Sequence, residues 1–156
     1  MHLSQSLLVD SAMVLALVLV GTIGYKLSPL LMPKADVVAT PAPGCDLHRS
    51  ACEAALPGEG RLRLALTPRP IPVAAPLEIA VDVEGMAAER VAVDFAGVSM
   101  NMGYNRPALE PAGNGRFAGQ GTLPVCVTGR MTWQATVLVE RGRERIAVPF
   151  RFDAGH

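Results

Sequence analysis

Two methionines in residues 98–107 stand two positions apart, a spacing at which side chains on an extended chain point to the same face. The Cα atoms of Met100 and Met102 would then lie roughly 6.5 to 7 Å apart. A thioether is a soft, neutral donor, and among biological metals it suits Cu(I) best. The pair has two interpretations: a copper site at a strand end, or two side chains that fill gaps in a core. Residues 103–107 are typical of a turn.

A second group of soft donors is Cys45, His48 and Cys52, in the pattern C-x2-H-x3-C. In a helix the three would share one face, but the spacing matches no common zinc pattern. The alternative is a disulfide. Seven residues of helix rise about 10.5 Å, whereas a disulfide needs Cα atoms within about 7 Å. The segment cannot be both, and we predict a Cys45–Cys52 bridge, with a metal or redox role as the alternative.

The third cysteine, Cys126, lies in the segment Leu-Pro-Val-Cys-Val-Thr-Gly. It is either a small buried apolar residue or a thiol that reacts or binds metal. Met100, Met102 and Cys126 form the candidate Cu(I) site, with His48 as a weaker fourth ligand. Two thioethers and a thiolate select Cu(I) over Zn(II) or Mg(II). The site requires the strand that ends at Met102 and the turn that holds Cys126 to meet at one end of the domain.

The elements that would position these residues are short strands, because apolar residues alternate with polar ones along most of the chain after residue 60. The alternation covers residues 61–66, 77–84, 91–102, 116–123, 131–140 and 146–152. This pattern predicts an all-β domain, an immunoglobulin-like antiparallel β-sandwich over residues 61–156. Pro149 indicates that the last strand lies at an edge of a sheet. The expected inward residues are Ile79, Val81, Val93, Trp133, Ala135, Val137 and Val148.

Before this domain the chain is apolar, and residues 7–32 carry only the charges of Asp10 and Lys26. The uninterrupted apolar core, residues 11–25, has the length of a signal peptide, but no Lys or Arg precedes it. We predict an uncleaved transmembrane helix over residues 1–32, followed by a proline-rich linker and the cysteine segment over residues 33–60. Lys26 and Lys34 would place the domain in the cytoplasm. The cysteines favour the opposite side, and we expect an extracytoplasmic domain.

Composition excludes several classes of function. The chain has 14 basic and 14 acidic residues in 156, so it has no basic face for nucleic acid. It contains no G-x-S-x-G, no H-E-x-x-H and no phosphate-binding loop. We therefore predict that the protein is not an enzyme.

The order of features resembles small membrane-tethered or exported proteins of the FixH, YtkA-like and CopC-like kind. The resemblance covers about 90 residues and rests on residues 91–95, Met-Asn-Met-Gly at 100–103, residues 113–117, Met-Thr-Trp at 131–133 and residues 148–150. It implies an immunoglobulin-like fold, a link to copper handling or haem–copper oxidase maturation, and the extracytoplasmic side. The segment that holds Cys45 and Cys52, and the turn that holds Cys126, depart from this pattern.

These observations predict a copper-binding or metallation accessory protein in the bacterial inner membrane, with one membrane span and its C-terminal domain in the periplasm. Its partners would be the membrane and a protein of an oxidase or copper-transport system. Two alternatives stay open. One is a thiol–disulfide partner in which Cys45, Cys52 and Cys126 exchange bridges. The other is a structural accessory subunit that binds no metal.

Overall fold

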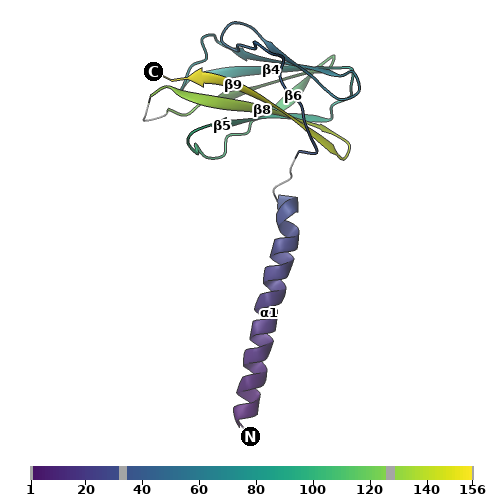
Figure 1. Cartoon of the computed structure of the whole chain (residues 1–156), viewed down its shortest axis with the longest axis vertical. Coiled ribbons are helices and arrows are strands. Elements are labelled where there is room, and N and C mark those ends of the chain that lie inside the picture. The colour runs from purple at the N-terminus through teal and green to yellow at the C-terminus, as the bar shows by residue number, and fades with distance from the viewer. Residues whose placement is uncertain (1, 32–34, 126–128, 156) are drawn as a thin grey trace. The chain divides into compact units, whose positions relative to one another are not determined.

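The structure is a computed structural model that describes residues 2–31, 35–125 and 129–155. The chain divides into two units, Met1–Lys34 and Ala35–His156 (Figure 1). The first contains helix α1 (His2–Leu31), in which the segment Val9–Lys26 has a mean hydropathy of 1.5 and exposed side chains. A helix that is apolar on all sides needs a protein core or a lipid bilayer around it. By length and composition, α1 therefore fits a single-pass membrane anchor or a signal sequence.

The second unit is a mixed sheet of nine strands within the described residues. The order across the sheet is β1-β9-β8-β5-β6-β7-β4-β3-β2. Only the β1–β9 pair is parallel, and the other neighbours are antiparallel. The strands are β1 (Val37–Val38), β2 (Cys52–Ala55), β3 (Arg61–Thr67), β4 (Pro76–Glu84), β5 (Arg90–Gly97), β6 (Ala108–Gly113), β7 (Arg116–Thr122), β8 (Met131–Arg141) and β9 (Glu144–Ala154).

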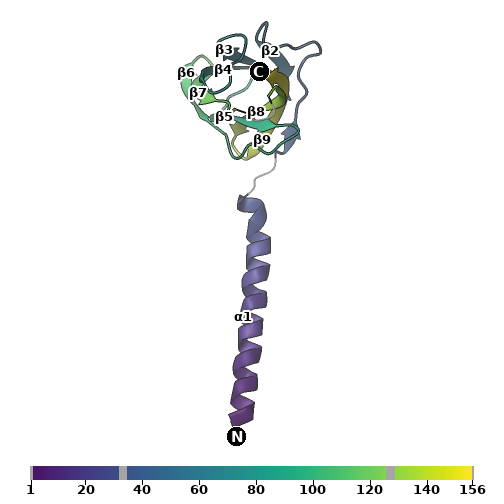
Figure 2. The ribbon, with the colours of Figure 1, turned by 90° about the vertical axis from the view of Figure 1, so that its left-hand side faces the viewer.

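Strand β6 makes the sheet curl. Its residues Ala108 and Leu109 pair with β5, whereas the residues from Glu110 onward pair with β7. One strand thus joins β1-β9-β8-β5 to β7-β4-β3-β2, and the strands surround a common interior in the end-on view of Figure 2. The prediction of an all-β domain after one apolar helix is confirmed at this level.

Alternation along the strands fills that interior. Burial alternates residue by residue along β4 and β8, so one face of each strand is apolar and enclosed. The seven residues predicted to point inward are all 1% exposed or less, which confirms the predicted core. Trp133 is the largest of the fully buried side chains. Its indole Nε1 is the one buried side-chain nitrogen or oxygen without a partner among the described residues.

The structure differs from the expected boundaries in residues 33–60. From Ala35 onward this segment belongs to the β unit, because β1 and β2 lie at the two edges of the sheet. An isolated bridge between Pro41 and Ala54 brings the two edges together. Strands of two and four residues are too short to produce the alternation that identifies strands in a sequence.

Two further expectations change. Strand β5 ends at Gly97, so residues 98–102 are a loop rather than a strand. A hydrogen bond from Val98 N to Thr132 O, at 3.0 Å, still links the start of this loop to β8. Strand β9 is also not the edge strand that Pro149 indicated, because β1 lies outside it. However, β1 pairs only with Ile146 and Ala147, so the ring nitrogen of Pro149 costs no ladder bond there.

Candidate functional site

The candidate site is the methionine loop, which we define as residues 98–104 between β5 and β6. Hydrogen bonds fix the loop on both sides. Before it, Val98 N donates to Thr132 O of β8 at 3.0 Å. After it, Asn105 O accepts from Phe95 N at 2.8 Å, and Asn105 Nδ2 donates to Thr122 O of β7 at 2.9 Å. The loop therefore presents its side chains from a fixed frame at one end of the β unit.

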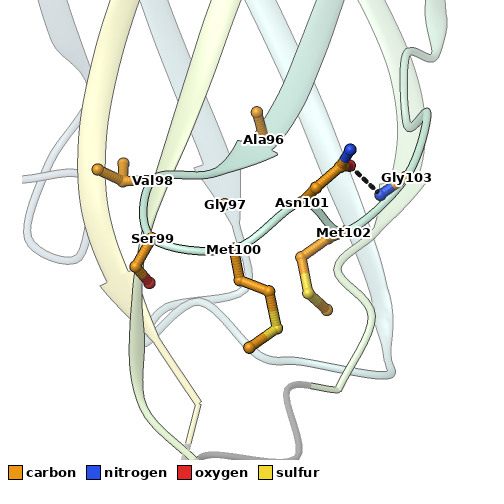
Figure 3. Close-up of a pocket in the computed structure, with 8 residues that line it drawn as sticks. All are labelled: Ala96, Gly97, Val98, Ser99, Met100, Asn101, Met102 and Gly103. Atoms are coloured by element: carbon orange, nitrogen blue, oxygen red, sulfur yellow. Dashed lines mark hydrogen bonds between the residues drawn. The ribbon is translucent and has the colours of Figure 1, made fainter.

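Residues 96–103 line an open pocket of about 310 Å³, and none of them carries a charge. Asn101 Oδ1 accepts a bond from Gly103 N at 2.9 Å, which shapes the turn. Figure 3 shows the side chains of Met100 and Met102 on the same side of the loop, while Asn101 points away from them. The structure thus brings the two predicted thioethers to one side, although the backbone between them is not a strand.

The two methionines differ in exposure. Met100 is 39% exposed, whereas Met102 is half-buried and packs against the apolar core. One thioether is therefore open to solvent and the other is anchored. This combination can serve both interpretations, because a buried methionine fills space and an exposed one is free to bind.

A third methionine, Met131, lies under the loop, although its position in the sequence predicts only a strand residue. Met131 is the first residue of β8, is 7% exposed and belongs to the core. A Cβ atom built on Gly97 would collide with Met131 Cε and with the carbonyl oxygen of Met100, and would lie 3.2 Å from Met102 Cγ. Atoms of Met131 and Met102 therefore both lie beside the position that a side chain on Gly97 would occupy. The two residues are 29 positions apart in the sequence, so no local pattern predicts that they lie near each other.

His48, the predicted fourth ligand, has both ring nitrogens in use. Nδ1 accepts from Ile71 N at 3.2 Å, so the proton sits on Nε2, which donates to Asp153 O at 2.6 Å. The ring also meets Phe152 edge-on, with the ring centroids 6.2 Å apart. Metal binding by His48 would cost one of these two bonds. The structure uses the histidine to attach its loop to β9.

Cys45 and Cys52 form a disulfide, with Cα atoms 5.4 Å apart. Between them, the amides of Arg49 and Ser50 donate to Asp46 O at 3.0 Å, which forms a tight turn. Cys52 is 3% exposed and Cys45 is half-buried. A bridge enclosed in this way fits a structural role better than rapid thiol exchange, which requires access to a sulfur atom.

Cys126 lies outside the described residues, so its part in a metal site stays a prediction from the sequence. Within residues 2–31, 35–125 and 129–155, no group of three or more His, Cys, Asp and Glu side chains could hold a metal ion. The soft donors that the described residues do bring together are thioethers.

Charges beside the loop are paired with one another. Arg106 Nε lies 3.1 Å from Asp94 Oδ1, and its guanidinium lies over the ring of Tyr104 at 5.4 Å from the centroid. The pair offsets the charge of Arg106, the basic residue that follows the loop. A ligand held in the pocket would meet lining residues that carry no charge, which suits a soft monovalent ion better than a hard divalent one.

Comparisons with protein-family models, with curated proteins and with solved structures find no match. The resemblance to FixH, YtkA-like and CopC-like proteins therefore stays a prediction from the sequence.

Proposed function

We propose that the protein is a membrane-anchored, extracytoplasmic copper-binding or metallation accessory protein that holds Cu(I) at the methionine loop. One observation carries the proposal: Met100 and Met102 lie on the same side of an uncharged open pocket whose loop is hydrogen-bonded to the domain on both sides. Soft donors on a fixed frame meet the needs of Cu(I). Fixed donors also lose little entropy when they bind.

The thioethers suggest transfer rather than storage. They are neutral, so they add no charge attraction to the bound ion, and they exchange more readily than thiolates. In the proposed site Cys126 is the strongest donor, as the sequence predicts, and the methionines supply selectivity. The partner that we propose is a protein of a haem–copper oxidase or of a copper-transport system in the same membrane.

Transfer requires the partner to approach the loop closely. The loop supports such a contact, because its large side chains Val98 and Tyr104 stay exposed. Exposed apolar side chains that lie together on a surface mark interaction sites. Together with Met100, which is also exposed, they would contact the partner.

We also propose an immunoglobulin-like fold and an extracytoplasmic location for the β unit. The curled sheet is compatible with an immunoglobulin-like sandwich, because β9-β8-β5 and β7-β4-β3 enclose one core that holds Trp133. The disulfide supports an oxidising compartment, and the apolar helix supports an anchor. We propose the bacterial periplasm, with FixH, YtkA-like and CopC-like proteins as the related group.

The test is a competition titration with a chromophoric Cu(I) chelator, on the full chain in detergent micelles under anaerobic conditions. Wild type is compared with Met100→Leu/Met102→Leu, with Cys126→Ala and with a control, Met86→Leu, whose methionine lies between β4 and β5. We expect the first two variants to bind Cu(I) more weakly than wild type and the control to match it. Equal affinity in all four, or no binding above the background of the chelator, contradicts the proposal and favours a structural subunit.

A further inference from the structure

We propose that Met131 is a third thioether donor to Cu(I) at the methionine loop, and that Gly97 is the residue that admits it. This inference rests on the proposed function and adds a ligand to the same site. The juxtaposition that carries it is the approach of Met131 Cε and Met102 Cγ to one point, the position that a Cβ atom on Gly97 would take.

The three thioethers approach the site from two different elements. Met100 and Met102 belong to the loop itself, whereas Met131 approaches from β8, on the core side of the loop. Donors from two separate elements can enclose an ion, while two donors on a single short loop can only touch it from one side. Met131 therefore supplies what the loop alone lacks.

Gly97 makes room for Met131 beside the loop. This residue ends β5 and pairs in register with Trp133, so its backbone is in strand conformation, which tolerates any ordinary residue. Space, rather than backbone conformation, makes glycine necessary here, because a Cβ atom would overlap Met131 Cε and Met100 O. The glycine thus leaves room for Met131 of β8 and for the methionine loop beside the end of β5.

Neither the proposed donors nor the residues that line the pocket carry a charge. Three thioethers are neutral, so a bound Cu(I) keeps its single positive charge in a pocket whose lining residues carry none. Such a set discriminates strongly against divalent ions, whose hydration is not repaid by soft neutral ligands. The Met131 donor would raise affinity for Cu(I) without creating a site for Zn(II) or Mg(II).

The experiment uses the full chain in detergent with Cys126→Ala as the background, which removes the thiol from the sulfur count. Copper K-edge X-ray absorption counts the sulfur ligands, and a competition titration measures affinity. We expect three sulfur ligands in the background protein and two after Met131→Leu. Outer-shell changes at metal sites already lower affinity about 10- to 100-fold, so loss of a direct donor should cost at least about tenfold. Met86→Leu is the control and should change neither quantity.

Leucine conserves most of the volume of Met131, so the variant should fold, and the fluorescence of Trp133 two residues away reports whether it does. If it does not fold, the sulfur count of the background protein decides alone. Two sulfur ligands in the background protein, or equal Cu(I) affinity with and without Met131, would show that Met131 is only a packing residue. Either result would still be consistent with Cu(I) binding by Met100 and Met102. No copper binding in wild-type protein overturns both this inference and the proposed function.

Discussion

At the scale of single residues, the site depends on side chains that are absent as much as on those that are present. Gly97 contributes empty volume, and Met131 and Met102 fill it. Replacement of Gly97 by alanine would force a backbone oxygen and a thioether apart, because the overlap includes Met100 O as well as Met131 Cε. The same residue thereby couples the end of β5, the methionine loop and the start of β8.

We expect Gly97→Ala to weaken Cu(I) binding and to do so through Met131. In a double-mutant cycle, Gly97→Ala should therefore reduce affinity much less in a Met131→Leu background than in wild type. Chelator competition measures all four proteins, and thermal unfolding confirms that each is folded. Additive losses would show that Gly97 acts by another route, such as displacement of the Met100 carbonyl group.

His48 is predicted to matter for stability more than for metal. His48→Ala would leave Ile71 N–H and Asp153 C=O without their partners, and Ile71 is buried. An unpaired buried group costs about 1 to 3 kcal/mol, so the free energy of unfolding should fall by about that amount. Denaturant unfolding measures it, with Arg49→Ala, an exposed neighbour in the same turn, as the control. A His48→Ala variant as stable as wild type but weaker in Cu(I) binding would instead make His48 a ligand.

At the scale of elements, the two ends of the β8–β9 hairpin contact different parts of the β unit. One end, at Met131 and Ala154, lies under the methionine loop. At the other end the chain enters the unit, where Asp36 N donates to Arg145 O at 2.8 Å. Glu140 of β8 forms ion pairs with both neighbouring strands at this end. Its Oε2 lies 2.7 Å from Arg90 Nε of β5, and its Oε1 lies 2.8 Å from Arg145 Nη2 of β9.

These contacts make stability at the entry end depend on pH. Hydrogen bonds from Arg90 and then from Arg145 hold the pKa of Glu140 below its ordinary value of 4.5. The stabilisation is therefore complete above the pKa of the unfolded chain and is lost as pH falls through the lower folded pKa. Glu140→Gln should be less stable than wild type at pH 7, and the difference should shrink in acid.

Denaturant unfolding between pH 7 and pH 3 measures this difference. Glu110→Gln, which removes an exposed carboxylate that makes no ion pair among the described residues, is the control. A difference between wild type and Glu140→Gln that is the same at every pH would show that the carboxylate contributes through packing rather than through its charge.

The disulfide is an element-scale feature too, because it closes the turn that leads into β2. For a loop of this length the chain-entropy account gives a stabilisation of about 2 to 3 kcal/mol. Cys45→Ser/Cys52→Ser should lower the free energy of unfolding by about that amount and leave Cu(I) affinity unchanged, because these sulfur atoms lie outside the proposed site. Loss of copper binding without loss of stability would instead support the metal role that the C-x2-H-x3-C spacing allows.

At the scale of the whole molecule, the β unit is a curled sheet with two short edge strands, and a bridge between Pro41 and Ala54 links the edges. Closure of this kind protects a sheet from pairing with other chains. It leaves the loops at the ends of the unit as the parts with free donors and exposed apolar side chains. The proposed copper site and Asp36 lie at opposite ends of the β8–β9 hairpin.

The sequence was sufficient to predict the long strands β3, β4, β5, β8 and β9, because each buries one face and exposes the other over seven or more residues. It did not predict β1, β2 or β6. In β6 only Leu109 is buried and Pro111 interrupts the pattern, so its pairing depends on neighbours distant in sequence. Met131 was missed as a donor for the same reason, since its contact with Met102 exists only after β5 and β8 pair.

The proposed location makes a prediction for the whole chain. If the β unit is outside the cytoplasm, a C-terminal alkaline phosphatase fusion expressed in bacteria should be active, because that enzyme needs disulfides to fold. A C-terminal fusion to a reporter that works only in the cytoplasm should be inactive. The reverse pair of results would agree with Lys26 and Lys34 under the positive-inside rule. It would contradict an exported domain.

The central claim is that Cu(I) binds to the methionine loop, and methyl NMR of the methionines tests it most directly. The chain has seven methionines, and Cu(I) is diamagnetic, so each labelled Cε methyl resonance stays observable as the ion is added. One equivalent of Cu(I) is expected to shift the resonances of Met100, Met102 and Met131 and to leave Met86 in place. Unchanged resonances for Met100 and Met102, with the shifts confined to other methionines or absent, would contradict the account.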